Sequence, residues 1–450
     1  MTNHLSESGE AVAADVAGMG AGLAAREARL AVWGLGYIGS STAEAFAAAG
    51  VDVIGYDPDS ERVAVLRASQ ADKKFAVSSA VAAVLHDDCR VHMIAVPTER
   101  EGEPFNGALV SVFTDLAHAI ADGPLSGTCP LVVIESTLPP GTTEEVLFPL
   151  LVKHGLTIGR DLLVGLAPRR DWFLAEGYGL RELDRIYSGV DDLSAIAVRD
   201  VLALVNDVLH QAPSHLEGEL VKCVENAYRH MDITLANELS LAFPHVDMVE
   251  VLRLAGTKWN IGTYHPSFGT GGYCIPLSSR YLITGARHPQ ELGLLRRAVE
   301  TDDRMRILVA DAVRSRPPVV ILGIAYKGGI KVDILSPAKA IVQRLLEHGV
   351  EVTVHDPMYT NEEIEKLLGV GVTTDDVAGA LRAARTVLII PDHPEFTDSL
   401  YMEALNHPRE GGLRVIDNHG VLAAATWADH VKYSRAGGEN WLESEKGLDQ

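Results

Sequence analysis

Short apolar runs alternate with longer amphipathic segments through the first half of the chain. The runs at 30–33, 51–57, 92–96 and 131–135 have the length and composition of buried strands, and an alanine-rich helical stretch fills 41–49. Strands that alternate with helices pair in parallel, because each helix returns the chain to the same end of the sheet. The pattern therefore predicts a doubly wound α/β domain.

This alternation stops near residue 217 and resumes near residue 319. Few helix breakers occur from about 217 to 243, which indicates one long helix between two domains, with a pair of ordinary helices as the alternative. The resumed pattern predicts strands at 319–323, 350–356, 387–391 and 415–417, and a helix at 337–348. A second parallel α/β domain is expected there.

The expected fold class is α/β, with two Rossmann-like doubly wound parallel-sheet domains joined by a long central helix and a helical region. Residues near the start are rich in Ala, Gly and Glu and lack the basic start and apolar core of a signal peptide. The predicted parts are a disordered extension at 1–28, a first α/β domain at 29–212, a central helical domain at 213–305, a C-terminal α/β domain at 306–435 and a frayed polar tail at 436–450.

Charge and cysteine content narrow the class of function. The 450 residues carry 39 Lys and Arg against 61 Asp and Glu, a net charge of −22, which argues against a nucleic acid or an anionic membrane as the partner. No apolar run reaches the roughly 18 residues of a membrane span. The four cysteines form no CxxC pair, so we expect no metal site and a reducing, cytoplasmic location.

A glycine-rich turn follows the first predicted strand. Gly34 permits a tight turn, Gly36 lets a pyrophosphate approach the backbone, and Gly39 lets the next helix pack against the strand. Asp57 ends the second strand, where a carboxylate accepts hydrogen bonds from ribose hydroxyls and disfavours a 2′-phosphate. This arrangement predicts NAD binding; a glycine turn without a cofactor is the alternative.

One cysteine lies in a glycine-rich loop that a proline closes. The loop runs from Phe268 to Pro276 and contains Cys274. A thiolate is the strongest common nucleophile among side chains, so covalent chemistry is expected here. The alternative is a small buried apolar residue, which is the commoner role of a lone cysteine.

Ten short motifs occur in the order found in the UDP-glucose/GDP-mannose dehydrogenase family, which the chain resembles over roughly 29–430. They are GLGYIG at 34–39, VPT at 96–98, ESTxxPGTT at 135–143, ELVKxxxN at 219–226, NE at 237–238, GGYCIP at 271–276, LGxAYK at 322–327, SP at 336–337, HDP at 355–357 and DHPEF at 392–396.

The resemblance implies a fold and a reaction. It implies an N-terminal NAD-binding domain, a helical middle that forms a homodimer through 217–243, and a C-terminal domain that binds a nucleotide sugar, with a UDP-sugar favoured. It also implies oxidation of the C6 primary alcohol of that sugar by two NAD. The aldehyde is held as a thiohemiacetal and then as a thioester, which water hydrolyses to a uronic acid.

The resemblance also assigns roles to individual residues. At three positions a role without function is the alternative: a solvated lysine at 222, a surface amide at 226 and an exposed loop lysine at 327. The implied catalytic residues are Cys274, Lys222, Asn226 and Thr137. The implied cofactor contacts are Gly34, Gly36, Tyr37, Ile38, Gly39, Asp57, Pro97, Thr98 and Thr137. The expected substrate contacts are Lys222, Asn226, Tyr264, Gly271 and Lys327.

Two departures from the family pattern concern acids used in catalysis. Ser278 stands four residues after the cysteine, where the family has an aspartate, and a serine is no anionic base near neutral pH. Pro168 is followed by Arg169 and Arg170 where the family has a glutamate, and Asp171 is a candidate replacement.

Two further departures concern the C-terminal domain. Ile334 takes the place of an arginine, and Asn418-His419 replaces Thr-Arg after an aspartate. Together the four changes leave several hypotheses open. These are full oxidation of an unusual nucleotide sugar, oxidation that stops at the aldehyde or proceeds by a modified hydrolysis, a non-catalytic relative that only binds its ligands, and a 3-hydroxyacid dehydrogenase of similar layout.

Overall fold

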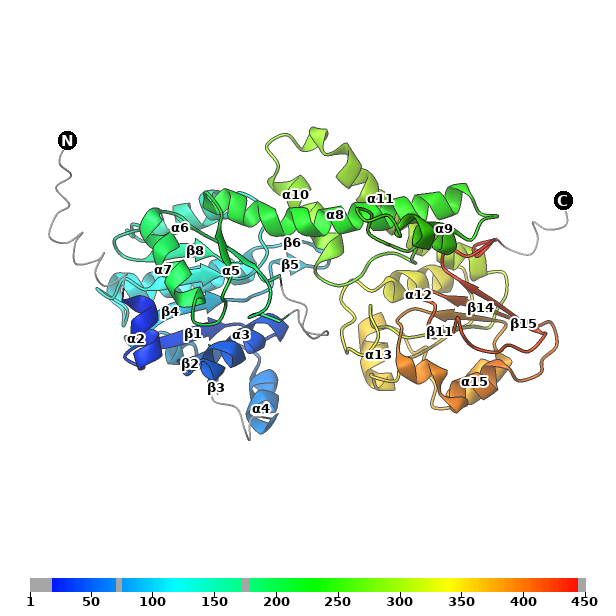
Figure 1. The fold of residues 1–450 in the computed structure, drawn as a ribbon. Coiled ribbons are helices and arrows are strands. Elements are labelled where there is room, and N and C mark those ends of the chain that lie inside the picture. Colours follow the sequence, from blue (N-terminus) through cyan, green and yellow to red (C-terminus); the bar gives the residue numbers. More distant parts are fainter. Residues whose placement is uncertain (1–17, 70–74, 171–178, 444–450) are drawn as a thin grey trace. The chain divides into compact units, whose positions relative to one another are not determined.

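The computed structural model describes residues 18–69, 75–170 and 179–443, which form two compact units (Figure 1). The first unit comprises residues 1–225 and 281–289, and the second comprises 226–280 and 290–450. Each unit is built around its own sheet and is described by itself.

The first unit contains an eight-stranded sheet in the order β10-β9-β8-β7-β4-β1-β2-β3. Its pairs are parallel except β8 with β9, an antiparallel pair that the alternating pattern did not predict. The strands are β1 (Arg29–Trp33), β2 (Asp52–Tyr56), β3 (Ala76–Ser78), β4 (Cys89–Ile94), β7 (Leu131–Ile134), β8 (Leu163–Leu166), β9 (Arg185–Gly189) and β10 (Leu209–Gln211).

Helices cover both faces of this sheet. They are α3 (Tyr37–Ala48), α4 (Ser60–Ser69), α5 (Gly107–Asp122), α6 (Phe148–Lys153) and α7 (Asp192–Leu202), beside the short hairpin of β5 (Glu99–Arg100) and β6 (Glu103–Pro104). Central strands such as β1 and β4 contribute alternate side chains to two separate apolar clusters, one on each face. Nearly continuous apolar runs are what a sheet covered on both faces requires.

The predicted disordered extension is wrong for its last part. Residues 1–17 lie outside the described residues, but α2 (Met19–Ala25) is a helix. Met19 and Leu23 are buried in the apolar cluster that also contains residues of α7. Two apolar side chains four residues apart on one helical face supply this burial, which the alanine-rich composition concealed.

The second unit contains a five-stranded sheet in the order β12-β11-β13-β14-β15, parallel throughout. Its strands are β11 (Val319–Leu322), β12 (Val352–His355), β13 (Thr386–Ile389), β14 (Leu413–Asp417) and β15 (Val431–Arg435). The helices that lie wholly within this unit are α9 (Met248–Ala255), α11 (Gly293–Val313), α12 (Pro337–Glu347), α13 (Asn361–Leu368), α14 (Val377–Ala383) and α15 (Ser399–Leu405). The predicted α/β class is confirmed, with one parallel sheet and one sheet that is parallel except for β8 with β9.

Two helices contribute residues to both units. The long helix predicted near 217–243 is α8 (His215–Ala242), so one helix and not a pair fills this segment. The second is α10 (Ile275–Gly285), which begins immediately after the predicted nucleophile.

The frayed tail is also a wrong prediction for the residues up to 443. Trp441 is almost fully buried and stacks on Phe268, with 5.9 Å between the ring centroids. Arg414 donates a hydrogen bond of 2.7 Å to the Trp441 carbonyl. An aromatic side chain of this size holds the end of the chain against the second unit, although the residues around it are polar.

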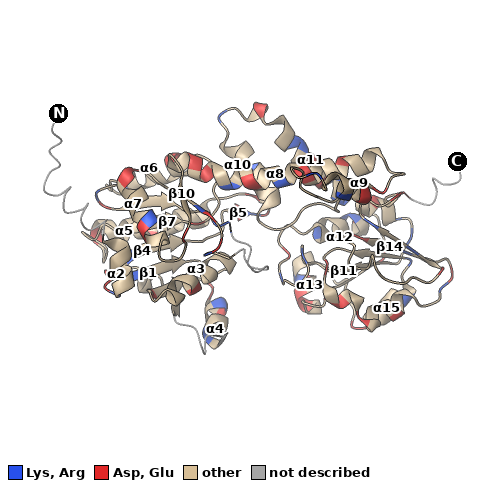
Figure 2. Ribbon diagram, viewed as in Figure 1, with Lys and Arg blue, Asp and Glu red and all other residues tan. Residues whose placement is uncertain are grey.

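Charged residues of both signs are interspersed on the helices of each unit, as Figure 2 shows. The negative net charge is therefore not concentrated on one element. Among the described residues, no helix combines the length and the apolar character needed to cross a bilayer.

Candidate active site

The glycine turn after β1 has the geometry that a dinucleotide requires. Gly34 has a φ of +85°, which favours glycine, and a Cβ at Gly39 would lie 1.8 Å from the Gly34 carbonyl oxygen. A Cβ at Gly36 would meet nothing within 4 Å in the part of the chain that the structure describes. The first turn of α3 follows directly. Its backbone N–H groups, together with the uncovered backbone at Gly36, suit the binding of a pyrophosphate.

Asp57 ends β2 beside this turn. Its Oδ2 accepts a hydrogen bond of 2.8 Å from the Leu35 amide, and its Oδ1 accepts one of 3.0 Å from the Asp59 amide. The Arg62 guanidinium lies 3.9 Å from the carboxylate, and 8% of Asp57 is exposed. A carboxylate oxygen accepts more than one hydrogen bond, so Asp57 retains the capacity to bind ribose hydroxyls.

The structure brings together two predicted residues at the carboxyl ends of β4 and β7. The Thr98 hydroxyl donates a 2.7 Å hydrogen bond to the Thr137 carbonyl and lies 3.0 Å from the Tyr281 hydroxyl. Thr137 is half-buried, and Pro97 and Tyr37 are exposed. Thr98 therefore fixes the backbone at Thr137. Because the backbone is fixed, the direction of the Thr137 side chain is restricted as well.

Arg169, one of the substitutions after Pro168, is buried under the dinucleotide helix. Its guanidinium donates to the Thr42 hydroxyl, to the Ser41 hydroxyl at 2.9 Å and to the Ile38 carbonyl at 3.2 Å. Thr42 also donates to the carboxylate of Glu135, which pairs with another buried arginine, at position 185. Arg169 thus braces the helix that follows the glycine turn, and Asp171 lies outside the described residues.

Glu219 holds the first half of α8 against the PGTT segment. Its buried carboxylate accepts hydrogen bonds from the Gly141 amide at 2.6 Å and from the Thr143 amide and hydroxyl at 2.9 and 2.6 Å. Burial raises the pKa of this carboxyl, while the hydrogen bonds oppose the rise. Lys222 follows one turn later and is half-buried.

In the second unit, Cys274 is exposed and directly precedes the first residue of α10. Behind it, the Ser278 hydroxyl donates a 2.7 Å hydrogen bond to the Cys274 carbonyl and accepts one of 2.9 Å from the Asn226 amide nitrogen. Asn226 and Ser278 are each about 2% exposed or less. The serine that replaces the family aspartate therefore connects Asn226 to the backbone of the cysteine.

A second contact between α8 and α10 was not predicted. The Nδ1 atom of His230 lies 2.9 Å from the Ser279 hydroxyl, and both residues are buried. His230 comes four residues after Asn226, so the two side chains share one face of α8. The spacing of Asn226 and His230 could have predicted that they share a helix face. It could not predict their partners on α10, which come from another part of the chain.

The first part of the loop before Cys274 is fixed by three side chains from other segments. The Phe268 amide donates a 2.7 Å hydrogen bond to Asn418 Oδ1, and the Thr270 amide donates one of 2.5 Å to Asp302. Arg306 donates to the Thr270 carbonyl at 2.9 Å and pairs with Asp302 at 2.8 Å. Asn418, one of the residues that depart from the family pattern, thus holds the cysteine loop in place.

The cysteine loop also packs against the segment that carries Lys327. A Cβ at Gly271 would lie 2.5 Å from the Tyr326 Cβ, so only glycine fits there. The Gly272 amide donates a 2.8 Å hydrogen bond to the carbonyl of Ile334, another departure from the family. Two predicted substrate contacts, Gly271 and Lys327, therefore belong to neighbouring segments of the second unit. Another, Tyr264, is half-buried and lies along the chain between α9 and the cysteine loop.

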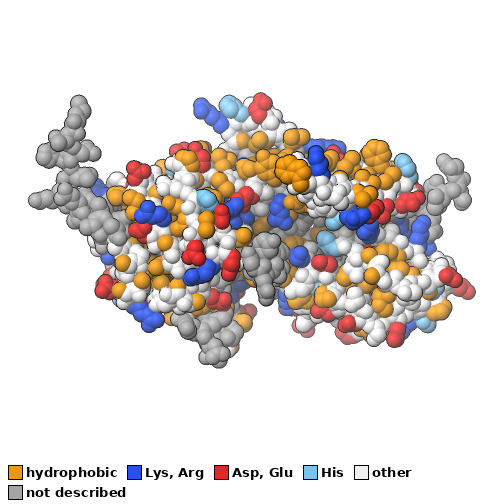
Figure 3. Space-filling model, viewed as in Figure 1, with side chains coloured by type: hydrophobic (Ala, Val, Ile, Leu, Met, Phe, Trp, Pro, Cys, Tyr) orange, Lys and Arg blue, Asp and Glu red, His pale blue; other side chains and the backbone are white. Residues whose placement is uncertain are grey.

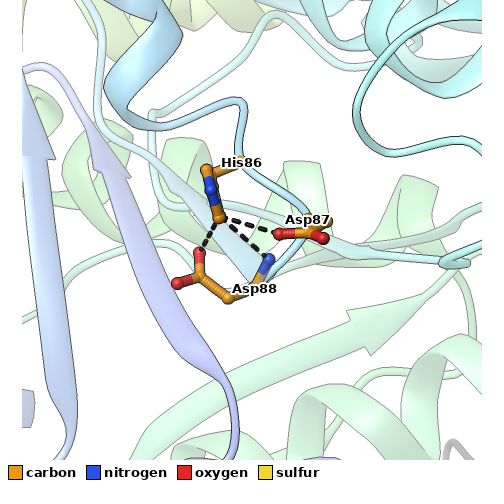
Figure 4. Close-up of side chains that lie close together, drawn as sticks. All are labelled: His86, Asp87 and Asp88. Atoms are coloured by element: carbon orange, nitrogen blue, oxygen red, sulfur yellow. Dashed lines mark hydrogen bonds and ion pairs between the residues drawn. The ribbon is translucent and has the colours of Figure 1, made fainter.

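One cluster has the composition of a metal site. His86, Asp87 and Asp88 lie close together, with the His86 Nδ1 2.8 and 2.9 Å from the two carboxylates (Figure 4). His86 and Asp87 are more than half exposed, and Asp88 lies 3.6 Å from Arg29. Three consecutive surface residues that already pair with one another and with an arginine carry no argument for a bound metal.

Comparison with known proteins identifies three matching domain models of the UDP-glucose/GDP-mannose dehydrogenase family. Its NAD binding domain matches residues 28–202, its central domain matches 217–304 and its UDP binding domain matches 320–423. These matches cover most of the chain.

Individual relatives are nucleotide-sugar dehydrogenases by name. UDP-N-acetyl-D-mannosamine dehydrogenase of Pyrococcus horikoshii is 31% identical over 401 residues, 82% of this chain and 90% of the relative. UDP-N-acetyl-D-glucosamine 6-dehydrogenase of Pseudomonas aeruginosa is 26% identical over 400 residues, 82% of this chain and 92% of the relative. A solved structure of UDP-D-ManNAc dehydrogenase from Pyrococcus horikoshii has a TM-score of 0.76 at 27% identity, covering 92% of this chain and 100% of that one.

Proposed function

Because the chain belongs to the UDP-glucose/GDP-mannose dehydrogenase family, we propose that it oxidises C6 of a UDP-linked sugar to a carboxylate through a covalent intermediate on Cys274. The protein is an NAD-dependent nucleotide-sugar dehydrogenase, so the expected enzyme class and cofactor are confirmed. The observation that carries the covalent route is the exposed Cys274 at the start of α10, with Asn226 and Ser278 ordered behind it.

The glycine turn and Asp57 fit the cofactor. Gly34, Gly36 and Gly39 would leave the pyrophosphate close to the backbone at the start of α3, and Asp57 would hold ribose hydroxyls. Bound NAD supplies the hydride acceptor for each of the two oxidations. Arg169 would keep α3 in place while Thr98 orients the Thr137 segment.

Cys274 performs the step that allows the second oxidation. Its sulfur forms a bond to the aldehyde carbon, the carbonyl π electrons move to oxygen, and that oxygen takes a proton to give a thiohemiacetal. An aldehyde carbon gives up a hydride readily only after such an addition. Loss of the hydride from this carbon and of the proton from its hydroxyl leaves a thioester; water then adds, the carbon–sulfur bond breaks with return of a proton to the sulfur, and the carboxylate is released.

Lys222 and Asn226 are proposed to stabilise the negative oxygen that forms in the oxidation and addition steps. They lie one turn apart on α8, so a cation and an amide donor share one face of the helix. Thr137 is proposed to orient the water that attacks the thioester. The Ser278 hydroxyl is occupied by Asn226 and the Cys274 carbonyl, so its part is to align Asn226 and not to take a proton.

The proposed substrate is a UDP-N-acetylhexosamine. Relatives that match 82% of this chain are named for UDP-N-acetyl-D-mannosamine and UDP-N-acetyl-D-glucosamine, which supports this class. Lys327 is proposed to bind the diphosphate, because it lies in the segment after β11 at the carboxyl end of a parallel sheet. Tyr264 and Gly271 would line the sugar side.

A homodimer through α8 is part of the proposal. Val224, Tyr228 and Leu235 are 39%, 65% and 56% exposed on this helix, and Figure 3 shows hydrophobic side chains gathered along it. Apolar side chains exposed along one helix favour burial against a partner. The four cysteines form no disulfide in the described part of the chain, which suits the proposed location in a reducing cytoplasm.

The experiment is a product analysis with UDP-N-acetylmannosamine and UDP-N-acetylglucosamine. A uronic acid with two NADH per sugar is expected from the native enzyme, and Cys274→Ala should form no uronate. Uronate formation by the alanine variant at the native rate would contradict the covalent route. One NADH with an aldehyde product would instead support oxidation that stops halfway, and ligand binding without NADH would support a non-catalytic relative.

A further inference from the structure

Lys327 lies within a segment whose two ends are bound to one buried pair of side chains. The segment runs from 324 to 329, directly after Gly323 at the end of β11. The pair consists of Asp356, at the end of β12, and His393, after β13. Both side chains are 0% exposed.

The first end of the segment is held by Asp356. Its Oδ2 accepts hydrogen bonds from the Ile324 amide at 2.8 Å and from the Ala325 amide at 3.2 Å, and its Oδ1 accepts one from the Met358 amide at 2.9 Å. A buried carboxylate needs such donors to remain charged. Burial opposes ionisation, but the hydrogen bonds from His393 and the backbone amides hold the pKa of Asp356 below its ordinary value.

The second end is held by His393 and its neighbour. The Gly329 amide lies 3.1 Å from His393 Nδ1, and the Gly328 amide donates a 2.8 Å hydrogen bond to Asp392 Oδ1. An amide nitrogen only donates, so Nδ1 accepts, and Nε2 carries the hydrogen directed at Asp356 Oδ2, 3.3 Å away. A Cβ at Gly328 would lie 2.2 Å from the Asp392 carbonyl oxygen, so the backbones are in close contact.

We propose that His393 is a positioning residue for nucleotide-sugar binding, which links the Gly329 amide to Asp356 and so fixes the backbone on both sides of Lys327. This rests on the proposed role of Lys327 in binding the diphosphate. A lysine is a compact charge on a flexible stem, so its contribution to affinity depends on where its backbone is held. His393 itself is not catalytic, because both ring nitrogens are occupied and the side chain is buried.

The test is the affinity for UDP and for NAD, measured by calorimetry on the full-length enzyme, together with steady-state kinetics. His393→Ala should weaken UDP binding and raise the KM for the nucleotide sugar by about tenfold, as expected when a segment loses its preorganisation. The kcat at saturating substrate and the KM for NAD should stay within about threefold of the native values. A loss of fold alone would reduce all of these together.

Two conservative variants separate the two bonds that His393 makes. Asn places an oxygen near the position of Nδ1 and keeps the acceptor for Gly329, so His393→Asn should recover most of the UDP affinity. Gln places its amide nitrogen near the position of Nε2 and keeps only the donor to Asp356, so His393→Gln should not. His355→Asn is the matched control, because His355 bonds Tyr401 at 2.8 Å and its side chain is not part of the 324–329 contacts above.

The outcomes are distinct. Native UDP affinity in folded His393→Ala or in His393→Gln would overturn the inference, as would an equal loss of UDP and NAD binding. If the alanine variant does not fold, the comparison of Asn with Gln decides. Lys327→Met should lose UDP affinity; if it does not, the proposed role of Lys327 is wrong, whereas loss in Lys327→Met without loss in His393→Ala rejects only the role of His393.

Discussion

The turns after β1 and β11 share one backbone arrangement in the two units. Gly34 and Gly323 both have positive φ, +85° and +92°. In each turn, the amide of the next residue donates a 2.8 Å hydrogen bond to the aspartate that follows the neighbouring strand, Asp57 in one unit and Asp356 in the other. The local geometry is therefore the same in both.

The surroundings give the two aspartates different roles. Asp57 keeps 8% of its surface exposed, and α3 begins three residues after its glycine, so the acid borders the proposed phosphate site. Asp356 is covered by His393, and α12 begins only at Pro337. The long segment in between carries Lys327. The acid of the first turn thus lies at the proposed cofactor site, whereas the acid of the second turn holds a loop.

The largest effect should come from removing Asp356. Asp356→Ala strands the Ile324, Ala325 and Met358 amides and the His393 side chain, so we expect a loss of about 3–5 kcal/mol of stability. Asp57→Ala should cost less, about 1 kcal/mol, because it leaves two amides without their acceptor and no buried histidine. Chemical unfolding measures both variants. Equal losses would remove the distinction between a ligand-facing and a structural acid.

Acid should weaken the first unit around β1 and β4. His92 is fully buried on β4, where its Nδ1 accepts a 3.1 Å hydrogen bond from the Trp33 indole. Burial lowers the pKa of His92 from 6.5 to about 4. Because the folded pKa lies below the unfolded one, its contribution is complete above pH 6.5 and is lost as the pH falls toward 4, by about 3 kcal/mol in all.

Asp356 should respond only at lower pH than His92. Burial also lowers the pKa of His355 on β12, so this contrast concerns Asp356 and not the whole second unit. The folded pKa of Asp356 lies below its ordinary 3.8, so its contribution is present above pH 3.8 and is lost as the pH falls through the folded value. Hydrogen exchange from pH 7 to pH 4.5 should therefore show faster opening in β1 and β4 as His92 is protonated. His92→Asn should flatten that response in β1 and β4, and an unchanged response in this variant would contradict the assignment.

A moderate effect is expected on cofactor choice. Asp57→Ala removes the carboxylate next to the glycine turn, so NAD affinity should fall by about tenfold, as for the loss of a charged hydrogen bond. Discrimination against NADP should weaken as well, since the negative charge that opposes a 2′-phosphate is gone. Fluorescence titration with NADH and NADPH measures both. Unchanged NADH affinity would mean that Asp57 only supports the turn, as Asp356 does.

The smallest effect is expected at Ser278. Ser278→Ala leaves the Asn226 amide without its acceptor, and kcat should fall about fivefold, equivalent to about 1 kcal/mol. Ser279→Ala is the neighbouring control, because that hydroxyl bonds His230 instead. It should lower the unfolding temperature with little change in kcat. Equal kcat losses in the two variants would assign the effect to helix α10 as a whole.

The sequence by itself determined four strands of each sheet, the long helix α8, the glycine turn and the place of the loop that carries Cys274. Each of these depends on neighbouring residues: the period of apolar positions, the absence of helix breakers, and a glycine that tolerates positive φ. Motif order then indicated the family, and the three domain matches agree with it.

Tertiary structure alone decided what the polar departures do. Arg169 turns under α3, Asn418 holds the cysteine loop, Ser278 connects Asn226 to Cys274, and His393 covers Asp356. The structure also shows a helix, α2, in the segment predicted as a disordered extension, and a buried side chain, Trp441, in the segment predicted as a frayed tail. A buried polar group must find its partner among residues brought near by the strand order, and no local pattern records which residues those are.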